Sequence, residues 1–388
     1  MHYRNRLSSP CVAALLLLLG ACAGSPPAPG TAAVGGAPVD AAESATLAAT
    51  LAVGSVRLET VPQPLTPALS LVVASFDPGL PASSAGLSRA GIFPEIRKAE
   101  ARFMPVLLRQ VLQDSNAWGP VRVLPEPQST AELQIDGRIL HSDGRTLALH
   151  IRATDASGAI WLDRIYRDES QPGDFTASGS MDPFIDLYWQ VANDLLAAHR
   201  ERSSDALQQL PTIALLHQAT LLAPEAFAGY LTETDTGGYA LRRVPAEEDP
   251  MLGRVQRIRD QEYRFVDAVD QQYVDLFDTM QPTYNLWRQF GREQAEYRED
   301  YQRRLAQRDR AGPRGTFAAM EQTYNAFKWS KIQQQDLEDL ARGFNNEVQP
   351  TVLDVSGSVY RLSGSLESQY AQWRDILGDI FRLESGLP

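Results

Sequence analysis

The sequence predicts an α+β protein: an N-terminal α/β sandwich, a mixed sheet covered by helices, followed by an elongated all-α helical bundle with coiled-coil character. Three observations support this fold class. Residues 67–202 contain short apolar runs of strand length, which are separated by turn residues, and two segments with helical periodicity. Beyond residue 250, apolar side chains recur at spacings of three and four. The final segment keeps a heptad-like apolar seam for about four heptads, as coiled coils do.

The α/β domain, expected over residues 67–202, begins with an apolar run at 69–76 that stops at a turn, as a buried strand does. A second strand is expected at 121–124, and a meander of three strands at 133–141, 145–154 and 159–167. Apolar and polar residues alternate in the middle strand of the meander, which predicts one buried face and one polar face. The buried set is Leu147, Leu149 and Ile151, and the polar set is Thr146, His150 and Arg152.

Two helices complete this domain in the order β-α-β-β-β-β-α. They are expected over 92–114 and 182–202, where apolar residues fall on one helical face. Pro94 suits the first turn of its helix. Pro105 predicts a kink in the interior, at a cost of about 3 kcal/mol unless packing compensates.

The C-terminal half is expected to be a helical connector over 203–250, with one short strand at 239–244, and then the bundle over 251–388. The first bundle helix is expected to bend at Pro282, and the second to end at Gly312. A third helix is expected over 317–344 and a fourth from about 351 to 383. The apolar seam of the first helix has one polar interruption, Glu262.

The N-terminus has the pattern of an export signal. Arg4 and Arg6 precede a short apolar run that ends at Leu19-Gly20-Ala21-Cys22. The run is far shorter than the roughly 20 residues that span a bilayer. The small-small-Cys ending resembles the lipobox of bacterial lipoproteins, and the alternative is a soluble export signal with a chance cysteine. The resemblance implies that residues 1–22 are a lipoprotein signal peptide and that Cys22 carries acyl chains such as palmitate.

Residues 23–66 are rich in Ala, Gly, Pro, Ser and Thr and have few large apolar side chains, so we expect a flexible tether. A flexible chain of this length has a root-mean-square span of roughly 35–40 Å. In the lipoprotein resemblance, Ala23 after Cys22 implies release to the outer membrane. We therefore expect the protein at the cell outer membrane, anchored by lipid on its periplasmic face.

Charge and cysteine content exclude several classes of function. The formal net charge is −12, and removal of Arg4 and Arg6 with the signal leaves −14. Nucleic acid and anionic lipid are therefore not expected as general partners, because both require basic patches. The chain has two cysteines, Cys11 and Cys22, so the processed protein would have no disulfide, thiol nucleophile or thiolate metal site.

The sequence has no motif that assigns a catalytic residue, cofactor or metal. It lacks a phosphate-binding loop, a His-Glu-x-x-His zinc helix and a nucleophile elbow. Asp182 and Asp186 lie one turn apart at a helix start, where acids more often cap the helix than act as an acid–base pair. We therefore expect a protein that is not an enzyme.

Four residues are candidates for contact with a partner. The bundle is unusually aromatic, and most of its aromatic residues recur at the spacing of a helical core. Tyr301 and Trp329 lie off the seam and are candidates for exposure, where Tyr and Trp often dominate binding. His150 and Arg152 lie on the polar face of the expected sheet.

The α/β unit resembles the domain shared by the penicillin-binding-protein activator lipoproteins and the curli secretion lipoprotein. The resemblance covers about residues 67–202 and rests on the lipobox, the Pro-rich segment after it, the helix at 92–114 and the hairpin Asp155-Ala156-Ser157-Gly158-Ala159-Ile160-Trp161. It implies a periplasmic binding module, and no catalytic residue carries over.

Together these features predict a lipid-anchored envelope protein that binds or positions a periplasmic or outer-membrane protein without catalysis. Its membrane contact would be the lipidated Cys22. Two alternatives remain open at this point. An accessory lipoprotein of a lipid transporter would need an apolar groove between sheet and helices. A peptidoglycan or glycan hydrolase would need two carboxylates roughly 5–9.5 Å apart in a cleft.

Overall fold

A computed structural model describes residues 50–81, 92–175, 181–234, 238–246, 248–308, 335, 338–339, 342, 351–355 and 358–386. Cys22, the tether as far as residue 49, Trp329 and most of the helix expected over 317–344 lie outside these residues. The described residues belong to one compact unit, Thr46–Pro388. Within them, no helix is both long enough and apolar enough to cross a membrane.

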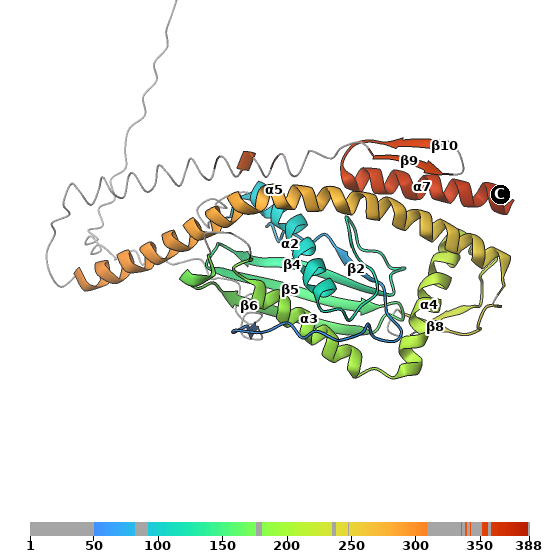
Figure 1. The fold of residues 1–388 in the computed structure, drawn as a ribbon, viewed down its shortest axis with the longest axis horizontal. Coiled ribbons are helices and arrows are strands. Elements are labelled where there is room, and N and C mark those ends of the chain that lie inside the picture. The colour runs from blue at the N-terminus through green and yellow to red at the C-terminus, as the bar shows by residue number, and fades with distance from the viewer. Residues whose placement is uncertain are drawn as a thin grey trace, which may run out of the picture. The chain divides into compact units, whose positions relative to one another are not determined.

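The N-terminal domain contains a mixed sheet, as predicted, but with six strands where the sequence predicted five (Figure 1). Its strands, in spatial order, are β1 (Leu51–Ala52), β6 (Ile160–Glu169), β5 (Thr146–Asp155), β4 (Leu133–Ser142), β2 (Leu71–Ala74) and β3 (Val121–Leu124). The meander β4-β5-β6 is antiparallel, whereas β2 pairs in parallel with both β3 and β4.

The apolar face of the sheet packs against α2 (Pro94–Asp114) and α3 (Ile185–Arg200). Leu147, Leu149 and Ile151 are buried there, and Pro105 lies buried within a continuous α2. On the opposite face His150 is half-buried and Arg152 is exposed, as predicted, whereas Thr146 is buried. A short 3₁₀ helix, Pro172–Asp174, follows β6.

The expected tether and the structure differ over residues 50–66, which lie against the α/β domain. Leu51 and Ala52 form β1, and the side chains of Leu58, Val61 and Leu65 pack on the core. The backbone of this strap, residues 50–66, is hydrogen-bonded to the domain: the amides of Val61 and Leu65 donate to the carbonyl oxygens of Ser115 and Ala117. Composition alone suggested no fold, because the surface that buries these side chains comes from distant helices and strands.

The connector contains α4 (Ser204–Leu222) and a two-stranded ribbon of β7 (Leu231–Glu233) and β8 (Tyr239–Leu241). Helix α4 begins at an N-cap, Ser203, whose side chain accepts a hydrogen bond from the amide of Ala206. It contacts α5 and the ribbon.

Helix α5 (Pro250–Arg308) is one continuous helix through Pro282, where we expected a bend between two helices. Buried side chains on both sides of the proline hold it against α2: the ring of Phe103 stacks on Phe277 at 4.1 Å and meets Tyr284 at 5.0 Å. Helix α5 also covers the edge strand β3, where Arg122 binds Asp267 at 2.7 Å. Covering this edge removes a free strand from solvent.

The helix expected from about 351 to 383 is wrong in its first part. The chain forms a hairpin of β9 (Thr351–Val355) and β10 (Ser358–Leu362), followed by α7 (Leu366–Ser385). Residues 351–362 are rich in β-branched side chains, which favour strands. Gly364, at φ +103°, turns the chain into α7, and Ser365 caps the helix by accepting from the amide of Ser368. Helix α7 packs along α5.

Candidate functional site

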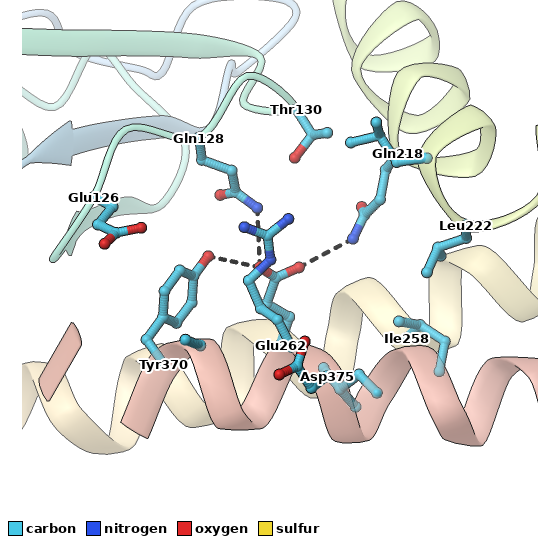
Figure 2. A pocket seen from close by; sticks show the side chains of 13 residues that line it. Glu126, Gln128, Thr130, Gln218, Leu222, Ile258, Glu262, Tyr370 and Asp375 are labelled. Atoms are coloured by element: carbon cyan, nitrogen blue, oxygen red, sulfur yellow. Dashed lines mark hydrogen bonds and ion pairs between the residues drawn. The ribbon is translucent and has the colours of Figure 1, made fainter. Parts of the chain in front are cut away.

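A cavity of about 390 Å³ lies where the loop after β3 meets α4, α5 and α7 (Figure 2). This volume lies within the range of small-molecule sites. Its lining residues are Glu126, Gln128 and Thr130 from the loop, Gln218, Leu221 and Leu222 from α4, Ile258 and Glu262 from α5, and Tyr370, Ala371, Arg374, Asp375 and Leu377 from α7. Four segments far apart in the sequence therefore build one site.

The carboxylate of Glu262 is the centre of this cavity. Its Oε1 accepts hydrogen bonds from Gln128 Nε2 at 3.1 Å and from the Tyr370 hydroxyl at 2.6 Å. Its Oε2 accepts from Gln218 Nε2 at 3.0 Å. Figure 2 shows these three side chains converging on Glu262 from three sides. Glu262 is 3% exposed, so the three donors replace the water that a carboxylate requires.

Local sequence explains why Glu262 and Tyr370 face each other. Glu262 lies in the buried seam of α5, one turn after Ile258 and one turn before Val266. Tyr370 occupies the same kind of position on α7, one turn before Trp373. The ring of Phe265 stacks on Tyr370 at 6.1 Å, and this apolar contact holds the phenol beside the carboxylate.

Negative charge predominates among the lining residues. Three carboxylates, on Glu126, Glu262 and Asp375, oppose one guanidinium, on Arg374. Arg374 Nε lies 3.7 Å from Glu262 Oε1, and its side chain is 48% exposed, so this ion pair is loose. Burial, followed by the charge of Glu262, raises the pKa of Tyr370 well above its ordinary value. The phenol therefore stays protonated and donates to Glu262.

Two buried acceptors at the cavity have no donor. The carboxylate of Glu262 can only accept, so the amide nitrogens of Gln128 and Gln218 face it. Their Oε1 atoms are buried and have no hydrogen-bond partner within the described structure. An unpartnered buried acceptor costs about 1–3 kcal/mol, which a bound donor recovers. An apolar wall formed by Ile258, Leu222 and Leu377 lies beside these polar groups.

Both oxygens of Glu262 already accept hydrogen bonds, which fix the position of the carboxylate in the cavity. Among the described residues that line the cavity there is no histidine, cysteine or serine. The described part of the chain also contains no cluster of three or more side chains able to hold a metal ion.

The structure brings His150 and Arg152 together, away from this cavity, on the polar face of the sheet. His150 Nε2 lies 2.6 Å from Asp163 Oδ1, and Arg152 Nη1 lies 3.8 Å from Asp163 Oδ2. Tyr301 lies on α5, but neither its side chain nor Trp329 belongs to the described part of the structure.

The Asp182 and Asp186 carboxylates serve structural contacts. Asp182 Oδ1 accepts from the amide of Phe184, and Oδ2 pairs at 2.5 Å with Arg288, which is fully buried. Asp186 accepts from the amide of Val56 in the strap at 3.2 Å. Neither acid lines the Glu262 cavity, so this pair does not supply the two carboxylates of a hydrolase there.

Most described bundle aromatics belong to the core, as their spacing predicted. The buried ones include Phe265, Phe277, Tyr284, Tyr370 and Trp373. Sequence reasoning did not select Glu262 as a site residue, although a glutamate within an apolar seam is a usable signal. Gln128 and Gln218 carried no such signal.

A second cavity of about 800 Å³ lies beyond the carboxyl ends of β2 and β3, near the start of α2. Four of its charged side chains pair with one another: Lys98 with Glu95 at 2.9 Å, and Arg102 with Glu367 at 2.8 Å. Asp77 pairs with Arg138 outside the cavity at 3.4 Å, and Asp136 accepts a hydrogen bond from Gln134.

No protein-family model matches the chain, and the search of curated proteins gives no match.

Proposed function

We propose that this protein is a lipoprotein anchored through Cys22 to the outer membrane, acting as a non-catalytic binding or scaffold module for a periplasmic or outer-membrane protein. The Glu262 cavity carries the proposal. It has the size of a ligand site, and its central carboxylate is held by Gln128, Gln218 and Tyr370. A charge fixed in this way favours recognition of a complementary group.

The docked strap affects how far the proposed lipid anchor would place this module from the membrane. Residues 50–66 lie on the domain, so the proposed tether is shortened to residues 23–49. A flexible chain of that length spans roughly 26–31 Å. The module would then lie close to the membrane, with its negative charge opposing direct contact with anionic lipid headgroups.

Two finer points belong to the same proposal. We infer that α5 and α7 belong to an elongated helical bundle with coiled-coil character, for which the sequence predicts a further helix over 317–344. The likeness of residues 67–202 to the activator and curli secretion domains would make the sheet domain the module's scaffold.

The anchor is tested by metabolic labelling with a clickable palmitate analogue and by envelope fractionation. The wild-type chain should be labelled and found in the outer-membrane fraction, whereas Cys22→Ser should be unlabelled and soluble in the periplasm. Labelling of Cys22→Ser, or absence of label from both proteins, contradicts the anchor.

The partner is tested by crosslinking in cells, followed by affinity purification and mass spectrometry. We expect one envelope protein enriched with the wild type and reduced with Glu262→Gln. The matched control is Asp260→Asn, which removes the same charge from the exposed side of α5 two residues away. Equal recovery with all three proteins contradicts a role for the cavity in partner binding. Turnover of a glycan substrate by the purified protein contradicts the non-catalytic assignment.

A further inference from the structure

We propose that the Glu262 cavity binds a primary aliphatic ammonium group, presented by a lysine side chain of the partner or by a free alkylamine. This inference deepens the proposed binding function and rests on it. Three properties of the cavity support it: the sign of its charge, its unpartnered acceptors and its apolar wall.

The charge of the lining selects for a cation. Glu262, Glu126 and Asp375 outnumber Arg374, so the lining has a net formal charge of −2 at neutral pH. Glu262 is almost fully buried, and a buried charge acts at a lower effective dielectric than one in water. A second cation entering the cavity gains attraction from all three carboxylates, whereas an anion is repelled.

The hydrogen-bonding pattern selects for a donor-rich group. Gln128 Oε1 and Gln218 Oε1 are buried acceptors without donors, and the two amides approach Glu262 from different elements. An ammonium has three donors and no acceptor, so it complements this set without adding an unsatisfied acceptor.

The apolar wall selects for a hydrocarbon stem. Ile258 and Leu377 are buried at 5% and 2% exposure, and Leu222 continues their surface on α4. Lysine and alkylamines extend a methylene chain along apolar surface while the charged end stays among polar groups. The cavity volume of about 390 Å³ accommodates such a chain.

Substitution of Arg374 should change amine affinity in the direction opposite to substitution of Glu262. Its guanidinium is half-exposed and 3.7 Å from Glu262, so it competes with an incoming ammonium for the same carboxylate. Removing its charge should tighten amine binding, whereas it would weaken the binding of any anionic ligand.

The test is isothermal titration calorimetry on the full-length protein in detergent micelles, with empty micelles as the blank. The probes are n-pentylammonium chloride, Nα-acetyl-lysine methylamide and, as a neutral isostere, 1-pentanol. Both amines should bind at least about tenfold more tightly than the alcohol, because charge-assisted hydrogen bonds are lost with the alcohol. Absence of amine binding, or equal binding of amine and alcohol, overturns the proposal.

Variants locate the site. Glu262→Gln should weaken amine binding about 10- to 100-fold, and Arg374→Gln should tighten it. Asp260→Asn, with the same charge change on the exposed side of α5, should leave it unchanged. Asp375→Asn, at a residue outside the buried network, should weaken it about two- to fivefold and keeps the test valid where Glu262→Gln does not fold. Unchanged binding in a folded Glu262→Gln or in Asp375→Asn overturns the proposal.

A partner-capture experiment distinguishes a partner lysine from a free alkylamine as the ligand. It also distinguishes failure of the ammonium site from failure of the proposed binding function. Partner capture that is lost after lysine acetylation of the envelope extract, and competed by n-pentylammonium, identifies a partner lysine. Amine binding by calorimetry, with partner capture unaffected by acetylation, identifies a free amine. Partner capture by a protein that binds neither amine leaves the proposed function standing and refutes the ammonium site.

Discussion

Arg288→Met should destabilise the protein by about 3–5 kcal/mol, because it leaves one member of a buried ion pair without its partner. Arg288 and Asp182 have side chains that are 0% and 1% exposed, and Nη1 of the arginine lies 2.5 Å from the carboxylate. Burial opposes the charged form of Arg288, yet Asp182 and the neighbouring Tyr284 raise the pKa of the guanidinium above its ordinary value. The arginine therefore stays charged and balances Asp182.

The predicted loss of stability follows from the contacts that Asp182 and the two neighbouring rings lose with the guanidinium. Methionine fills similar apolar space but gives Asp182 no counter-charge, and an unpaired buried carboxylate accounts for most of the 3–5 kcal/mol. The guanidinium also lies 4.4 Å from the Tyr284 ring centre and 4.8 Å from that of Phe184. Each such contact adds about 0.5–2 kcal/mol when desolvated.

Urea unfolding followed by circular dichroism measures this effect. The cost should shrink in the double variant Asp182→Asn/Arg288→Met, because neither charge of the pair remains buried. Arg257→Met is the control: this arginine lies on the same helix, is 63% exposed and pairs loosely with Glu384 at 3.6 Å, so its loss should cost less than about 1 kcal/mol. A cost below about 1 kcal/mol for Arg288→Met, or no recovery in the double variant, refutes the reasoning.

Three further predictions concern the packing of α5, a buried acid and the strap. Gly144→Ala should destabilise the protein by at least about 2 kcal/mol in urea unfolding, because φ is +84° and the new Cβ would lie 2.1 Å from the Arg288 carbonyl oxygen. The control is Gly173→Ala, at a glycine with open space around it, which should change the stability little. Equal effects of the two substitutions would contradict this packing. Burial, with Asp186, Asp174 and Asp182 nearby, raises the pKa of Asp168 to about 7, so its protonated form stabilises the fold below about pH 4 and this contribution is lost as the pH rises through 7. Asp168→Asn should therefore gain stability relative to wild type between pH 5 and pH 8, and a parallel pH profile for the two proteins would disprove the assignment. Asn193→Ala removes two hydrogen bonds to the strap, both 2.8 Å: the Glu59 amide donates to Asn193 Oδ1, and Asn193 Nδ2 donates to the Arg57 carbonyl. The variant should speed hydrogen exchange over residues 50–66, and unchanged exchange there would contradict the docking of the strap.

The α/β domain illustrates what local pattern can predict. Strand β5 alternates apolar and polar residues, and this period alone separates Leu149 on the buried face from His150 on the open face. The helices α2 and α3 follow equally from apolar residues at helical spacing. These elements were predictable because each one carries its own periodicity.

The hairpin at 351–362 shows where local pattern is ambiguous. Val352, Val355, Val359 and Leu362 fit a helical seam, but the same stretch pairs as two antiparallel strands. In the hairpin, Tyr360 packs edge-on against Trp373 of α7, with 6.1 Å between ring centres. Packing, and not spacing, decided between the two structures.

The sequence by itself determined five of the six strands and both helices of the N-terminal domain, the charge balance, and the position of Glu262 as a polar residue within an apolar seam. Tertiary structure alone decided what that seam glutamate meets. Its donors Gln128, Tyr370 and Gln218 are 134, 108 and 44 residues away along the chain. Period and composition describe how one segment divides between solvent and core, whereas a buried carboxylate is defined by donors that arrive from other segments. The same reason explains the strap, whose few apolar side chains become buried only when distant elements provide a surface for them.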